Sequence, residues 1–157
     1  MFSKKAVLAR LTTFSAIIGI SACTSPGSAL NCSSPAVQDL VIQIATDPVG
    51  KSVFTSFLAK KGGSVIPLYQ VKNKSYQEMI DFSRSSTEPL FKEAQEFSSR
   101  VISKLHLEKI RLVKRDESVG RINCAASLVA EGSVDISYSA QQTEAGELYV
   151  EVYGLDD

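Results

Sequence analysis

Apolar side chains recur at helical spacing between residues 33 and 105. The first stretch predicts a helix that begins near Ser33 or Ser34, with Pro35 at its first helical position. It is predicted to end at Asp47-Pro48, because the residue before a proline avoids helical geometry. A second helix is predicted over 51–61, and the longest predicted helix begins at Ser86 or Thr87 and runs to residue 105. Residues 64–74 are predicted to be irregular, and 76–82 to form one or two turns.

From residue 108 onward the apolar period changes to two, which is typical of strands with one buried face. Predicted turns at 116–120, 131–132 and 143–146 separate four strands. In the first strand Ile110 and Leu112 alternate with Arg111 and Val113. The inward positions predicted for the other three strands are Ile122, Cys124, Ala126, Leu128, Ala130, Val134, Ile136, Tyr138, Ala140, Leu148, Val150 and Val152. Short connections between strands predict an antiparallel meander.

Helices that precede a four-stranded meander predict an α+β fold in which the helices cover one face of the sheet. This order of elements is that of cystatin-like folds, and NTF2-like folds share the general outline. The analogy concerns architecture and implies no function. At 157 residues, the chain is long enough for one such domain and a targeting segment.

Residues 1–22 differ in composition from the rest of the chain. They carry Lys4, Lys5 and Arg10 and no acidic residue, and 11–22 are uncharged. This uncharged stretch is shorter than the roughly 20 residues that a spanning helix needs, and it fits the core of a signal peptide, about 7–15 residues. We therefore predict that 1–22 are a leader and not a helix of the folded domain.

The motif Ile20-Ser21-Ala22-Cys23 resembles the lipobox of bacterial lipoproteins. The resemblance implies that the leader is cut before Cys23, whose thiol carries a diacylglyceryl group and whose amine is usually acylated. Thr24 stands where an aspartate would favour the inner membrane, so the resemblance implies the periplasmic leaflet of the outer membrane. Residues 23–31 then form a short tether to a domain over 32–157. The alternative is an ordinary secretory signal followed by a chance cysteine.

Two cysteines remain once Cys23 is assigned to the anchor. Cys32 and Cys124 make an even number in an oxidising compartment, which favours a disulfide between them. Such a bridge would pin the first helix across the sheet. The alternative is two buried free thiols, and a catalytic thiol is a poorer hypothesis because the chain has one histidine to serve as base.

Charge is distributed unevenly along the chain. Without the leader the chain has 14 basic and 17 acidic residues, so its net charge does not favour nucleic-acid binding. Residues 99–121 hold seven bases and three acids, whereas 122–157 hold seven acids and no base. This segregation indicates either cross-strand charge pairing in the sheet or a surface that steers a partner by one sign of charge.

Tyr149, Glu151 and Tyr153 alternate with the inward residues of the last strand, so all three share its outer face. Tyrosine buries a large area at low entropic cost, and two tyrosines that flank a carboxylate suit an interface with a protein partner. The alternative is that another helix covers this face and buries both rings in the core.

No motif for catalysis, a metal or a cofactor supports an enzyme, and one histidine excludes an all-histidine metal site. We therefore expect no catalytic residues and no cofactor. The hypothesis is a non-enzymatic binding or assembly module in the envelope, anchored to the membrane through Cys23. The alternative is an inhibitor or immunity protein that neutralises a periplasmic toxin or hydrolase. A hydrolase with His106 as its base is a third hypothesis; His106 more simply contacts the last carbonyls of the preceding helix.

Overall fold

The computed structural model describes residues 5–8, 30–61, 66–143 and 145–155. The helices are α1 (Pro35–Lys61), α2 (Ile66–Val71), α3 (Tyr76–Ser85) and α4 (Pro89–Ile102). The strands are β1 (Lys5–Leu8), β2 (His106–Asp116), β3 (Arg121–Val129), β4 (Ser133–Gln142) and β5 (Leu148–Tyr153). Helices followed by an antiparallel sheet confirm the predicted α+β fold.

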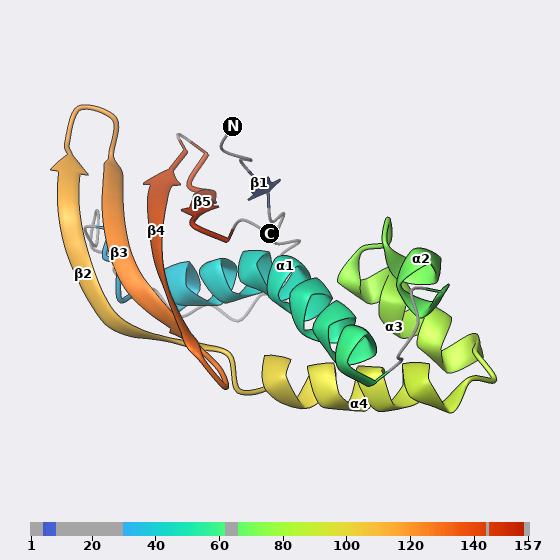
Figure 1. The fold of residues 1–157 in the computed structure, drawn as a ribbon. Coiled ribbons are helices and arrows are strands. Elements are labelled where there is room, and N and C mark those ends of the chain that lie inside the picture. Colours follow the sequence, from blue (N-terminus) through green and yellow to red (C-terminus); the bar gives the residue numbers. More distant parts are fainter. Residues whose placement is uncertain (1–4, 9–29, 62–65, 144, 156–157) are drawn as a thin grey trace, which may run out of the picture.

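The sheet has the strand order β1-β5-β4-β3-β2, and every neighbouring pair is antiparallel. Strands β2 to β5 are the predicted meander. The sequence did not predict β1, which lies within the proposed leader and pairs with the free side of β5 (Figure 1). The cleavage of the leader and the tether over 23–31 stay predictions, because most of these residues lie outside the described ranges.

Helix α1 packs into two separate apolar clusters. Its first half buries Val37, Val41 and Ile44 against the inner face of the sheet. Its second half buries Phe54 and Leu58 in a cluster with α2, α3 and α4. The helix therefore joins the sheet to the helical layer, and Figure 1 shows α2 and α3 beside the half of α1 that lies away from the sheet.

The predicted end of the first helix at Pro48 is wrong. Pro48 lies inside α1, which continues for 13 more residues to Lys61, and Figure 1 shows that the helix changes direction near its middle. Proline removes one helical hydrogen bond and bends a helix, at a cost of about 3 kcal/mol. Burial of apolar side chains on both sides of the bend offsets that cost, since each contributes about 1.5–3 kcal/mol.

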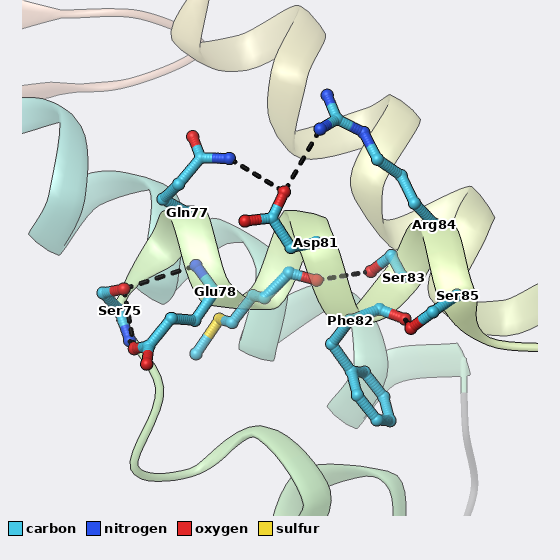
Figure 2. Close-up of polar contacts among 9 residues, drawn as sticks. Ser75, Gln77, Glu78, Asp81, Phe82, Ser83, Arg84 and Ser85 are labelled. Atoms are coloured by element: carbon cyan, nitrogen blue, oxygen red, sulfur yellow. Dashed lines mark hydrogen bonds and ion pairs between the residues drawn. The ribbon is translucent and has the colours of Figure 1, made fainter.

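The irregular segment predicted over 64–74 is also partly wrong, because α2 forms there. Burial of Val71 in the second apolar cluster accounts for this short helix, whose sequence has no extended period of its own. The turns predicted over 76–82 are confirmed as α3, which begins at a capping box. Ser75 accepts a hydrogen bond from the backbone of Glu78 (3.3 Å), whose carboxylate accepts one from the backbone of Ser75 (2.7 Å; Figure 2).

Cys32 and Cys124 form a disulfide, as predicted, with their Cα atoms 5.9 Å apart and a separation of 92 positions in the sequence. Both cysteines are buried in the cluster under the sheet. The Tyr138 hydroxyl donates a hydrogen bond to the carbonyl of Cys32 (2.9 Å), and burial raises the pKa of Tyr138 to about 12. A covalent bond and a buried hydrogen bond therefore fix the same point of the chain to β3 and β4.

The alternation predicted for the first strand of the meander does not hold along β2. Leu112 and Val113 follow each other and are 51% and 64% exposed. Register shifts between Glu108 and Arg111 and between Leu112 and Lys114 interrupt the alternation. Val134, predicted to face inward, is also exposed, at the start of β4. The other inward positions of β3, β4 and β5 are buried or pack against the core.

Candidate functional site

The predicted tyrosines lie on the outer face of the sheet, opposite the face that α1 covers. On β5, Val150 and Val152 enter the core, so alternation turns Tyr149, Glu151 and Tyr153 outward. All three side chains are half-buried and not part of either apolar cluster. The alternative that a helix buries these rings in the core is therefore not what the described residues show.

Glu151 links the two tyrosines directly. Its carboxylate accepts a hydrogen bond from the Tyr149 hydroxyl (3.1 Å) and one from the Tyr153 hydroxyl (2.6 Å). Ser139, its register partner on β4, donates a longer bond to the same carboxylate (3.4 Å). We call Tyr149, Glu151, Tyr153 and Ser139 the tyrosine cluster.

The electrostatics of the tyrosine cluster keep its hydroxyls protonated. The hydrogen bond to Glu151 raises the pKa of Tyr153 above its ordinary value, and partial burial adds to the effect. Partial burial is the larger cause of the raised pKa of Tyr149, followed by the bond to Glu151. Both phenols therefore stay neutral donors to Glu151 at physiological pH, and each oxygen keeps lone pairs that can accept a hydrogen bond.

Further side-chain hydrogen bonds join neighbouring strands elsewhere on the outer face of the sheet. The Arg121 guanidinium on β3 donates twice to the side-chain oxygen of Gln141 on β4 (3.2 and 3.0 Å). Nearer the other end of the same two strands, the Ser127 hydroxyl donates to Asp135 (2.9 Å). The outer face is thus a polar surface on which side chains of neighbouring strands hold one another in place.

Within the described part of the chain, most of the bases on β2 have no acidic residue opposite them on β3. The partners in register on β3 are Ala125 for Arg111, Asn123 for Lys114 and Ile122 for Arg115. Asp116 and Arg121 are the one oppositely charged pair in register between β2 and β3. Because β3 separates β2 from the acids of β4 and β5, the bases of β2 stay exposed on the edge strand, beside the acids Glu108 and Asp116. A surface that steers a partner by one sign of charge therefore stays a prediction.

His106 lies at the first position of β2 and is exposed. Its Nδ1 contacts the carbonyl of Lys104 (2.8 Å), as expected for a histidine after a helix, and its Nε2 contacts Glu108 (3.1 Å). The bond to the Lys104 carbonyl, and then that to Glu108, raises the pKa of His106. Both ring nitrogens therefore already have partners within the chain.

One feature was not predicted from the sequence: an apolar groove between α1, α4 and the turn from β3 to β4. Its volume is about 560 Å³, and it is lined by residues from three distant segments of the chain. No local motif marks such a groove, because its walls come together only through the packing of α1 on α4.

Cys23, the predicted site of lipid attachment, lies outside the described residues. None of the helices in the described ranges has the length and apolar character needed to cross a membrane. In the same part of the chain, no three or more His, Cys, Asp or Glu residues are grouped so that they could hold a metal ion. Comparison with known proteins found no matching family model, no matching curated sequence and no matching solved structure.

Proposed function

We propose that this chain is a lipid-anchored bacterial envelope protein whose domain binds a protein partner without catalysing a reaction. The lipobox-like motif ending at Cys23 supports the anchor, and Thr24 supports the periplasmic leaflet of the outer membrane. One observation carries the binding role: two half-buried tyrosines are both held by Glu151 on the face of the sheet opposite the helices.

The tyrosine cluster has the properties of a preorganised binding surface. Fixing a side chain on binding costs about 0.5–1.5 kcal/mol, and the bonds to Glu151 meet part of that cost before a partner arrives. The rings of Tyr149 and Tyr153 offer apolar area, and their oxygens can accept hydrogen bonds from a partner. Tyrosine is among the residues that contribute most to protein interfaces.

The proposed cleavage would also change the sheet beside the tyrosine cluster. In the full chain, β1 pairs with β5, with Ala6 opposite Glu151 and Leu8 opposite Tyr149. Removal of residues 1–22 would take β1 out of the sheet and leave β5 as an edge strand. Its backbone donors and acceptors would then be available next to the two tyrosines.

The first prediction concerns processing and anchoring. Intact mass of the protein extracted from its own membrane is expected to show the loss of residues 1–22, the added mass of the acyl groups, and two hydrogens fewer for the disulfide. A Cys23→Ala variant is expected to lack the acyl mass and to leave the membrane fraction. A mature chain without lipid, or one that begins elsewhere, would contradict the anchor.

The second prediction concerns the partner. Truncating Tyr149→Ala together with Tyr153→Ala is expected to reduce the recovery of the stoichiometric envelope partner about tenfold or more, because tyrosines central to an interface contribute about 2 kcal/mol or more each. The measurement is quantitative affinity capture from mildly solubilised envelopes of the native host. The matched control is Tyr69→Ala on α2, since Tyr69 is 73% exposed and lies away from the sheet.

The control variant is expected to capture as much partner as the natural protein. Urea unfolding of the double variant should stay cooperative and lose about 1–3 kcal/mol, as expected for two hydrogen bonds of about 0.5–1.5 kcal/mol each, so that the domain remains folded during capture. Undiminished capture, or a loss matched by equal unfolding, would contradict the role of the tyrosine cluster. A toxin or hydrolase as the captured partner would support the inhibitor alternative.

A further inference from the structure

The groove between α1, α4 and the β3–β4 turn has the dimensions of a small-molecule site. Its volume of about 560 Å³ falls within the range of about 300–1,000 Å³ typical of ligand pockets. It lies on the helical side of the sheet and is lined by residues of the second half of α1, the end of α4 and the turn at 130–133. The tyrosine cluster occupies the opposite, outer face.

The walls of the groove are mostly hydrocarbon. The rings of Phe57 on α1 and Phe97 on α4 lie 5.2 Å apart between centroids and are tilted by 32°. Both rings are only half-buried, although each packs against the other. Val134 is 45% exposed on the opposite wall. Apolar side chains that stay accessible in a concave site favour an apolar ligand over a sugar or a nucleotide, which would need convergent polar groups.

The charge at the rim of the groove is unequal. Lys60 and Lys61 lie in the last turn of α1 and are exposed, and Glu131 is the acidic residue among those that line the groove. Neither lysine forms an ion pair within the described part of the chain. Serine hydroxyls, among them that of Ser56, also border the groove and can donate hydrogen bonds. The rim therefore suits an anionic group attached to an apolar chain.

We infer that this groove binds a single-chain anionic amphiphile: its hydrocarbon chain lies along Phe57 and Phe97, and its carboxylate or phosphate contacts Lys60 and Lys61. The shared chemistry is one acyl chain with one anionic head, as in a free fatty acid or a monoacyl glycerophosphate. The inference rests on the groove alone and not on the lipid anchor or the tyrosine cluster.

The test measures binding of a dansyl-labelled fatty acid to the full chain in detergent-free buffer. Binding is expected to increase the dansyl fluorescence, and palmitate is expected to displace the probe. Ser56→Phe adds a ring at the wall of the groove and is expected to weaken probe binding about tenfold or more, as filling a pocket excludes its ligand. The matched control is Ala59→Phe, which adds the same ring to an exposed position of α1 that does not line the groove.

A second pair of variants tests the anionic head. The double variant Lys60→Glu with Lys61→Glu is expected to weaken palmitate binding about tenfold. A single exposed ion pair contributes little, but here both lysines contact the same anionic head. Displacement by the uncharged hexadecanol should not change. Lys92→Glu on α4, which is exposed and outside the groove, is the charge control. Separate titrations with palmitate and monoacyl glycerophosphate distinguish the two sources of the ligand.

Three results would overturn the inference. They are an absence of probe binding to the natural chain, equal binding by the Ser56→Phe and Ala59→Phe variants, or an unchanged preference for palmitate over hexadecanol in the double lysine variant. None of these results bears on partner capture through Tyr149 and Tyr153. The two proposals therefore fail separately, because partner capture and probe binding report on opposite faces of the sheet.

Discussion

Removal of the disulfide by Cys32→Ala with Cys124→Ala is expected to lower the free energy of unfolding by about 4–5 kcal/mol. The bridge closes a loop whose ends are 92 residues apart, and the chain-entropy model gives about this value for a loop of that length. The bridge acts mainly by limiting the conformations of the unfolded chain. Such a loss is a large part of the 5–15 kcal/mol by which most domains are stable.

Alanine is the appropriate replacement because both cysteines are buried, and a serine hydroxyl there would lack a partner in an apolar cluster. The measurement is urea unfolding followed by circular dichroism. The m value, which is the slope of the unfolding free energy against urea concentration, should also rise, because the unfolded chain without the bridge exposes more surface.

The natural protein in excess reductant provides the control and should unfold with the midpoint of the double variant. Each single variant should behave as the double one does, because one thiol cannot form the bridge. The hydrogen bond from Tyr138 to the carbonyl of Cys32 involves the backbone and survives the substitution. A loss below about 1 kcal/mol would show that the unfolded chain without the bridge retains structure that already restricts the loop.

The parts of the fold that could be predicted are those with local causes. Strands β3, β4 and β5 could be predicted because apolar and polar residues alternate along them. This alternation arises because one face of the sheet is buried and the other faces solvent. The start of α3 shows in Ser75 and Glu78, whose spacing is that of a capping box. The disulfide followed from the parity of the cysteines and the inward position of Cys124. For the strands and the start of α3, neighbouring residues carry the whole signal; for the disulfide, the number of cysteines and the face on which Cys124 lies carry it.

The parts that could not be predicted depend on distant contacts. The local rule for Pro48 predicts a helix end, but two separate apolar clusters bury the residues on either side of the proline and hold α1 in one piece. Asp47, which would suit a break between helices, instead accepts a hydrogen bond from the backbone of Tyr76, 29 residues away (2.7 Å). Burial outweighed the local preference.

The two candidate sites differ in the same way. Tyr149, Glu151 and Tyr153 belong to one strand, so alternation alone placed them on one face, although the bonds that tie them together required the structure. The groove is lined by Phe57 of α1 and Phe97 of α4. In the sequence, both residues lie at positions typical of the buried face of an amphipathic helix. Their accessibility follows from how the helices meet the β3–β4 turn.

Gly50→Ala is expected to destabilise the domain by about 1–3 kcal/mol, as overpacking of a core does. In an unconstrained helix interior the same change stabilises by roughly 0.5–1 kcal/mol, because alanine loses less backbone freedom. Here a methyl group on Gly50 would lie 2.6 and 2.7 Å from Cδ1 and Cδ2 of Tyr76 and closer still to Cγ. The steric effect therefore outweighs the gain in helix propensity.

The tyrosine ring cannot easily move away, because Tyr76 is held at both ends. Its backbone nitrogen donates to Asp47 (2.7 Å), and its hydroxyl donates to Ser98 on α4 (3.1 Å). A shift of the ring would strain one of these bonds or separate α3 from α1. Gly50 thus sets the distance at which the helical layer packs on α1, in the half of the helix that follows Pro48.

Urea unfolding of a double-mutant cycle isolates this contact. Gly50→Ala is compared in the natural chain and in a Tyr76→Ala background, where the added methyl group has room and should cost nothing or stabilise slightly. Gly132→Ala is the control, since nothing lies within 4 Å of the methyl group it adds. A coupling close to zero, or a stabilising effect of Gly50→Ala in the natural chain, would show that the helices can separate freely. The close packing of α1 on α3 would then not be what fixes the helical layer.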